Sequence, residues 1–101
     1  MGARVLPLQA RRTGENDAVE VARLAGLAAR EAREVAGLSL GEAAQRANLA
    51  LGCTVIWPEL VGLWERGAER PDVVQWLAMV AQAPPADAIR IVTDLVSNLA
   101  G

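Results

Sequence analysis

The stretch AGLSLGEAA, residues 36–44, contains the clearest helix boundary in the chain. Ser39 and Glu42 form an S-x-x-E capping box, in which each side chain satisfies a free backbone amide at a helix start. Gly37 stands just before this box, where a preceding helix must end. The stretch therefore predicts that one helix ends near residue 36 and that another begins at residue 40.

Two further stretches, LWERGAERP at residues 63–71 and DVVQWLAM at residues 72–79, mark the next boundary. Gly67 follows an apolar run that ends in Trp64, and a glycine at this place stops a helix. Asp72 can cap the helix that follows. We expect Trp64 and Trp76 to be buried anchors of the core on either side of this turn.

In this order, the three stretches resemble the phage-repressor/Cro-type (Xre-like) helix-turn-helix family, over about half of the chain. The resemblance implies an all-α domain of five helices, the third of which is the recognition helix that enters the DNA major groove. Arg30 and Arg33 extend the likeness upstream as an R-x-x-R pattern. Pairing of these arginines with Glu31 and Glu34 is the alternative interpretation.

Hydrophobic spacing and turn residues give the expected bounds of the helices. These bounds are about Ala18–Ala36, Leu40–Asn48, Val55 or Pro58 to Arg66, Val73–Gln82 and Ala86–Leu99. Gly26 weakens the middle of the first helix and suggests a join between two helices there. Residues 1–16 show no sustained period and predict a flexible basic arm. The helix-turn-helix domain is then expected to span residues 17–101, with its C-terminal helix at residues 86–99.

An apolar insertion at residues 49–57 separates the second expected helix from the third. Because of it, the distance in sequence from Ser39 to Trp64 exceeds the family's usual spacing by about seven residues, which indicates a lengthened turn. Solvent-exposed loops are usually polar, so this segment is expected to pack on the domain, on a second copy or on a protein partner. Cys53 is interpreted as a small buried hydrophobe, because no basic neighbour would activate its thiol.

The resemblance implies that the early exposed positions of the third helix meet base edges. Counted back from Trp64, these positions include Glu59, Gly62 and Leu63. Glu59 can accept a hydrogen bond from a cytosine amine, whereas no Arg, Asn or Gln occurs among the positions. Leu40 also replaces the polar residue that commonly follows the capping serine in this family. An acidic, apolar helix is repelled by phosphates, and this favours a protein partner as the alternative to DNA.

Charge is divided unevenly along the chain. The net charge is −2 and the pI is about 5.0, unlike the basic balance of most strong DNA binders. Residues 1–12 carry three arginines and no acid, whereas residues 13–101 carry seven arginines against twelve acids. Arg11 and Arg12 are therefore candidates for an arm in the DNA minor groove, with a solvated tail as the alternative.

Two arginines after the third helix, Arg66 and Arg70, stand where members of the family often meet phosphate. Pairing with the neighbouring Glu65 and Glu69 is the alternative. These arginines complete the set of DNA-binding candidates that the sequence offers.

One side of the expected C-terminal helix is apolar over a sector of roughly 160°. This sector is wider than the cover of one small core requires, so it predicts a homodimer seam, with simple core cover as the alternative. The candidate seam residues are Ile89, Val92, Leu95, Val96 and Leu99. The insertion at residues 49–57 is a rival position for the seam.

Composition argues against catalysis and bound cofactors. The chain has no His, Tyr or Lys and a single Cys, so no catalytic residue, metal site or cofactor is expected. No apolar run is long enough to cross a membrane, and the N-terminus lacks an apolar signal core. Together with the single cysteine, these features favour a cytoplasmic location.

Two functions fit these observations. The first is a DNA-binding transcriptional regulator of the repressor type that acts as a homodimer on double-stranded DNA. The family resemblance and the basic arm support it. The second is a helix-turn-helix scaffold for protein-protein binding, such as an antitoxin, an anti-repressor or an adaptor, with little DNA affinity. The acidic body and the apolar insertion support the second.

Overall fold

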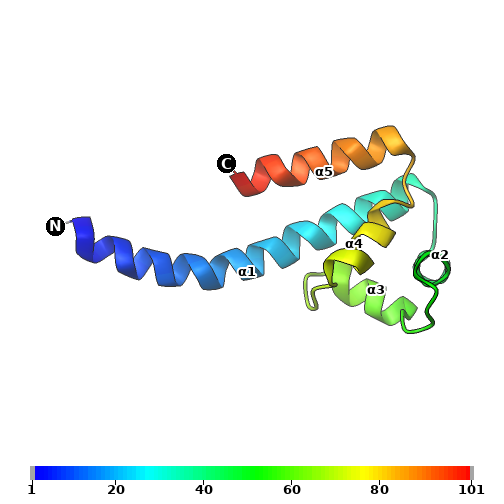
Figure 1. The fold of residues 1–101 in the computed structure, drawn as a ribbon, viewed down its shortest axis with the longest axis horizontal. Coiled ribbons are helices and arrows are strands. Elements are labelled where there is room, and N and C mark those ends of the chain that lie inside the picture. The colour runs from blue at the N-terminus through cyan, green and yellow to red at the C-terminus, as the bar shows by residue number, and fades with distance from the viewer. Residues whose placement is uncertain (1, 101) are drawn as a thin grey trace.

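The computed structural model describes the backbone of residues 2–100 and the side chains of residues 17–100. Within residues 2–100 the chain consists of helices and loops, and no strand is present (Figure 1). The helices are α1 (Gly2–Val35), α2 (Leu40–Leu51), α3 (Pro58–Glu65), α4 (Val73–Val80) and α5 (Pro85–Ala100). The predicted all-α class and the predicted five helices are confirmed for the part of the chain that is described.

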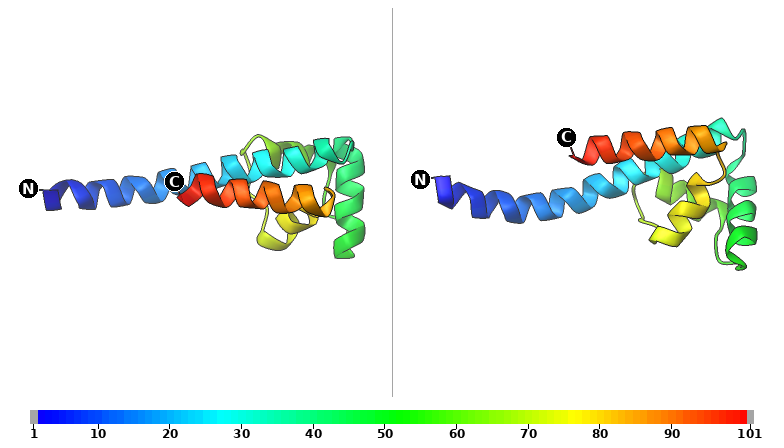
Figure 2. Two further views of the ribbon diagram at one scale, coloured as in Figure 1. Left: turned by 90° about the horizontal axis from the view of Figure 1, so that it is seen from above. Right: turned by 45° about the horizontal axis from the view of Figure 1, so that its top comes forward.

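The long helix α1 is the support on which the other elements are arranged. α5 runs antiparallel to α1 and lies along its C-terminal half (Figures 1 and 2). α3 and α4 pack on the other side of α1 near its C-terminal end, and α2 packs on α3 and α4. This arrangement leaves one side of α2 and α3 turned away from α1.

α1 is one continuous helix and begins upstream of the expected start at Ala18, because the backbone of residues 2–16 belongs to it. The join expected at Gly26 does not occur. Gly26 is buried, and a Cβ atom at this position would overlap the carbonyl oxygen of Trp64. A glycine in the middle of a helix is unfavourable on its own. Here its missing side chain allows α1 and the end of α3 to approach closely.

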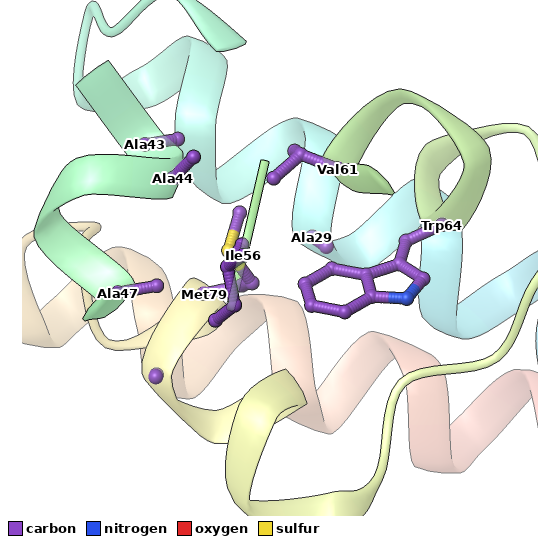
Figure 3. Close-up of a cluster of buried hydrophobic side chains, with 9 residues drawn as sticks. Ala29, Ala43, Ala44, Ala47, Ile56, Val61, Trp64 and Met79 are labelled. Carbon is purple, nitrogen blue, oxygen red and sulfur yellow. The ribbon is translucent and has the colours of Figure 1, made fainter. Parts of the chain in front are cut away.

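The main core lies between α2, α3 and α4, with one face of α1 against it (Figure 3). Small alanines on α2 let it approach its neighbours, while larger side chains fill the centre. The buried members are Ala29, Ala43, Ala44, Ala47, Ile56, Val61, Trp64, Ala78 and Met79. Trp64 is only 2% exposed, as predicted. Trp76 is partly buried, and its indole Nε1 donates to the carbonyl oxygen of Ala25 at 3.0 Å.

The buried side of α4 does not coincide with its most apolar positions. Val73 and Leu77 are exposed, whereas Ala78, Met79 and Val80 are buried. α4 packs against both α1 and α2, so its buried side is set by these two neighbours and not by its most apolar positions. The outward side of α4 is therefore apolar.

A partly buried ion pair joins the end of α1 to the end of α3. Arg33 donates to both carboxylate oxygens of Glu65, at 2.6 Å and 2.9 Å, and also to the carbonyl oxygen of Leu38 at 2.9 Å. The carboxylate of Glu65 raises the pKa of the Arg33 guanidinium. Arg33 thus pairs across the fold and not with Glu34, its neighbour on the same helix, which instead accepts from Arg30 at 3.1 Å.

Candidate nucleic-acid interface

The start of α2 is fixed by the capping box that the sequence predicts. The backbone N–H of Glu42 donates to the Ser39 hydroxyl at 3.1 Å, and the backbone N–H of Ser39 donates to the Glu42 carboxylate at 2.9 Å. This backbone hydrogen bond holds the pKa of Glu42 below its ordinary value. Ser39 itself is exposed, so the first turn of α2 stands at the surface.

The turn between α2 and α3 is held by one side chain, Asn48. Its amide accepts from the backbone N–H of Ile56 at 3.0 Å and donates to the carbonyl oxygen of Ile56 at 2.9 Å. The Cys53 thiol donates to the same amide oxygen at 3.4 Å. Since Ile56 is 2% exposed in the core, the insertion packs on the domain, which was one of the three expected positions. Cys53 is partly buried.

Other residues of the insertion point outward. Leu49, Val55 and Trp57 are all exposed, and Trp57 has 62% of its surface accessible. Trp57 is the N-cap residue of α3 but gives it no side-chain hydrogen bond. Thr54 does not cap α3, because the helix begins with Pro58 four residues later. This outward apolar surface is free to meet a further molecule.

A hollow lies on the side of α3 that faces away from α1, and we call it the Gly62 hollow. It measures about 430 Å³ and is lined by Leu40, Pro58, Glu59, Gly62, Leu63 and Arg66. Glu59 is exposed and Leu63 is partly exposed, whereas Gly62 is buried at the floor. The predicted positions Glu59, Gly62, Leu63 and Arg66 thus come together, and Leu40 joins them from the start of α2.

Arg66 lies across α3 and does not extend beyond its end. A Cβ atom at Gly62 would lie 3.3 Å from the Nη1 atom of Arg66, so the guanidinium covers the backbone one turn earlier. The outward side of α3 therefore carries the guanidinium of Arg66, a residue that the sequence analysis placed in the segment after the helix. The four-residue spacing of Gly62 and Arg66 is the signal that could have placed it there.

The seven arginines with described side chains fall into two groups. Those on α1 and α5 form ion pairs, namely Arg23 with Glu20, Arg30 with Glu34, Arg33 with Glu65 and Arg90 with Glu31. Arg46, Arg66 and Arg70 are exposed and form no ion pair with any side chain of residues 17–100. The pairing with Glu65 or Glu69 considered for Arg66 and Arg70 is therefore not observed. Arg46, on α2, was not among the sequence candidates.

The candidate dimer residues divide between two sides of α5. Leu95 packs partly against the cluster that joins α5 to α1, whose centre is Ile91. Ile89, Val96 and Leu99 are exposed, and Val92 is intermediate. An apolar furrow of about 390 Å³ separates α5 from α4, with Leu77, Val80 and Ala81 on one side and Ala88, Ile89 and Val92 on the other.

Arg11 and Arg12, the candidates from the expected arm at residues 1–16, have side chains outside the described residues. Their contact with DNA and the flexibility of the arm stay predictions. None of the helices in the described part of the chain combines the length and the apolar character that a membrane crossing requires.

Comparison with known proteins gives no match to a family model, to a curated protein or to a solved structure. The interpretation of α2 and α3 therefore depends on their own geometry and surface chemistry.

Proposed function

We propose that this protein is a DNA-binding transcriptional regulator of the repressor type, in which α2 and α3 form the helix-turn-helix unit. The observation that carries the proposal is the division of the arginines. Ion pairs neutralise the described arginines of α1 and α5, whereas Arg46, Arg66 and Arg70 on or beside α2 and α3 are left without one. Such guanidinium groups are available to neutralise phosphates.

The acids near this surface weaken the objection raised by the net charge of −2. The Glu42 carboxylate accepts the backbone N–H of Ser39, and both oxygens of Glu65 accept from Arg33. Glu59 is the exposed acid on α3, and a carboxylate there can accept from a cytosine amine. Residues 40–70 carry three arginines and four acids, and Arg33 neutralises one of these acids, so the local charge is near zero and less unfavourable to DNA than that of the whole chain.

The basic residues 1–12 serve in this proposal as a second contact, with Arg11 and Arg12 in the minor groove. Deletion of residues 1–12 removes three arginines and no acid. The slope of log affinity against log salt should then fall by about 2–3 for each protomer. An unchanged slope would show that this segment is a solvated tail.

A homodimer is part of the same proposal, because repressor half-sites lie about one helical turn apart and are read by two copies. The exposed Ile89 and Val96, with the furrow between α4 and α5, provide an outward apolar surface for it. Leu95 packs between α5 and α1, so the proposed dimer seam does not include it and is smaller than the seam predicted from the sequence.

The decisive test compares two charge-reversal variants that change the net charge equally. Arg46→Glu with Arg66→Glu should lower the salt slope of DNA binding by at least about 2 for each protomer. Arg23→Glu with Arg30→Glu, which alters paired arginines on α1, should leave most of the slope intact. Failure of the wild type to retain DNA at low salt, or equal losses in the two variants, would overturn the proposal.

A protein-binding scaffold is the second candidate, and one observation favours it. Leu49, Val55 and Trp57 form an exposed apolar edge beside α3, where a DNA reader ordinarily has polar side chains. An antitoxin, anti-repressor or adaptor would use such an edge to bind its partner. This function would be favoured if the wild type retained no DNA while Trp57→Ser abolished binding to an identified protein partner.

A further inference from the structure

From the Gly62 hollow, we infer that α3 reads a thymine that lies directly beside a guanine in the DNA major groove. The hollow receives the 5-methyl group of the thymine, and Arg66 donates to the guanine. This inference rests on the proposed function, because it assigns a base preference to the same surface.

The shape of the hollow comes from a missing side chain. Gly62 supplies the floor, and a Cβ atom there would lie 3.9 Å from the Cδ1 atom of Leu40, which is ordinary van der Waals contact. Pro58 and Leu63 complete the apolar part of the lining, and Glu59 and Arg66 form its charged part. An apolar group of a ligand that enters the hollow would therefore meet Leu40 and Leu63.

The side chains that line the hollow determine which group on the major-groove edge of a base can enter it. The carbonyl and amine edges of bases lose hydrogen bonds with water when they enter an apolar hollow, and this loss is unfavourable. The thymine methyl group is the one apolar group on the major-groove edge of the four bases, and aliphatic side chains commonly contact it. Thymine is therefore the base that matches the Leu40 and Leu63 side of the hollow.

The polar group beside the floor fixes the neighbouring base. The Nη1 atom of Arg66 lies 3.3 Å from where a Cβ atom at Gly62 would stand, so the guanidinium borders the apolar part of the hollow. A guanidinium donates to the O6 and N7 atoms of guanine in the commonest specific contact to a base. Arg66 forms no ion pair within residues 17–100, so its donors are available.

The experiment begins with duplexes recovered from a random pool by binding to the full-length protein. The recovered sites should contain thymine next to guanine. Each site is then synthesised with deoxyuridine in place of thymidine, which removes only the 5-methyl groups. Wild-type affinity at fixed salt should fall by about fourfold for each methyl group that is contacted, the value of burying one such group.

Two variants separate contact in the hollow from effects of DNA shape. Gly62→Ala fills the floor, and it should fold because alanine favours helix more than glycine does and because the flexible end of Arg66 can move. Leu63→Ala removes a wall. Both should reduce the difference between thymidine and deoxyuridine duplexes to less than twofold. Leu49→Ala, on an exposed leucine of α2 that does not line the hollow, should keep the full difference.

The outcomes separate the inference from the function on which it rests. Equal affinity of the wild type for the two kinds of duplex would overturn the inference and leave DNA binding intact. A thymidine preference that persists in Gly62→Ala would also overturn it, since the preference would then arise elsewhere. Recovery of no duplex at low salt would overturn the proposed function together with the inference.

Discussion

α2 and α3 are joined to the rest of the molecule by the main core and by partly buried hydrogen bonds, whereas α5 packs on α1 through a smaller apolar cluster and one exposed ion pair. Gln82, after α4, donates to the carbonyl oxygen of Ala43 on α2 at 2.9 Å, and Arg33 on α1 pairs with Glu65 on α3. α5 instead inserts Ile91 against Ala28 and Ala32 of α1. Hydrogen bonds are directional, and the Arg33–Glu65 pair is much less exposed than the pair of Arg90 with Glu31, so the orientation of α3 is fixed more strictly than that of α5.

This difference matches two separate tasks within the proposed function. A helix that reads bases must present its outward side in one orientation, and α3 is fixed at both ends by polar contacts through Ile56 and Glu65. A dimer seam requires apolar area more than defined orientation. The outward side of α5, with Ile89 68% exposed, offers such area. The following predictions test this contrast, from the largest expected effect to the smallest.

The largest effect is expected at Trp64, which supports α3 from within the core. Trp64→Ala should lower the free energy of unfolding by about 3–5 kcal/mol, because a large buried side chain would be replaced by a cavity. Urea denaturation followed by circular dichroism measures this change. Trp57→Ala is the matched control, since that tryptophan is 62% exposed and its loss should cost no more than about 0.5 kcal/mol. Similar losses in the two variants would contradict the position of Trp64.

The partly buried ion pair between Arg33 and Glu65 should make the next largest contribution to stability. Glu65→Gln removes the carboxylate that faces Arg33, whose side chain is 16% exposed, and should cost about 2 kcal/mol in unfolding free energy. Glu20→Gln breaks an exposed pair with Arg23 and should cost less than about 1 kcal/mol. Equal effects of the two substitutions in urea denaturation would show that the pair between α1 and α3 does not fix α3.

A change on α5 should affect association without loss of folding. Ile89→Asp with Val96→Asp places charges on exposed positions and should give a folded monomer, as measured by light scattering and circular dichroism. The unfolding free energy of the monomer should change by less than about 1 kcal/mol, because neither side chain is buried in the chain itself. Leu49→Asp is the control for the rival seam. Loss of self-association in that control alone would move the seam to the insertion.

The smallest effect concerns pH and the start of α2. The capping hydrogen bonds lower the pKa of Glu42 below its ordinary 4.5. A carboxylate with a lowered pKa stabilises the folded state fully above the unfolded pKa, and this stabilisation is lost as pH falls through the folded pKa. Glu42→Gln keeps a capping side chain that does not titrate. Its unfolding free energy should therefore decline less steeply than that of the wild type below about pH 4.5, with parallel curves above it.

Local features of the sequence predict much of the helix pattern. The starts of α2 and α4 were predicted from Ser39 and Asp72, and both residues cap their helices as expected. The stops predicted at Gly37 and Gly67 are confirmed, with φ of 72° and 74°. Such signals are readable because each involves hydrogen bonds or backbone angles within a few residues of the chain.

The candidate interface was predicted less completely. The sequence predicted Glu59, Gly62 and Leu63 as exposed positions of the third helix and Arg66 as a phosphate contact after it. All four line one hollow, although Gly62 is buried. The sequence did not place the Arg66 guanidinium over Gly62, because the direction of a long side chain depends on the space around it. The family resemblance predicted the order of the helices and which of them is the recognition helix. It could not show which arginines lack an ion-pair partner.

What the sequence determined by itself is the all-helical class and the positions where α2 and α4 begin, since capping and glycine act over a few residues. It left the start of α3 open between Val55 and Pro58. The tertiary structure alone decided the partners of side chains that are distant in sequence. Arg33 pairs with Glu65, 32 residues away, and not with the adjacent Glu34. Gly26 packs against the carbonyl oxygen of Trp64. These contacts depend on how closely helices pack in space, a distance that helix propensity and hydrophobic spacing do not encode.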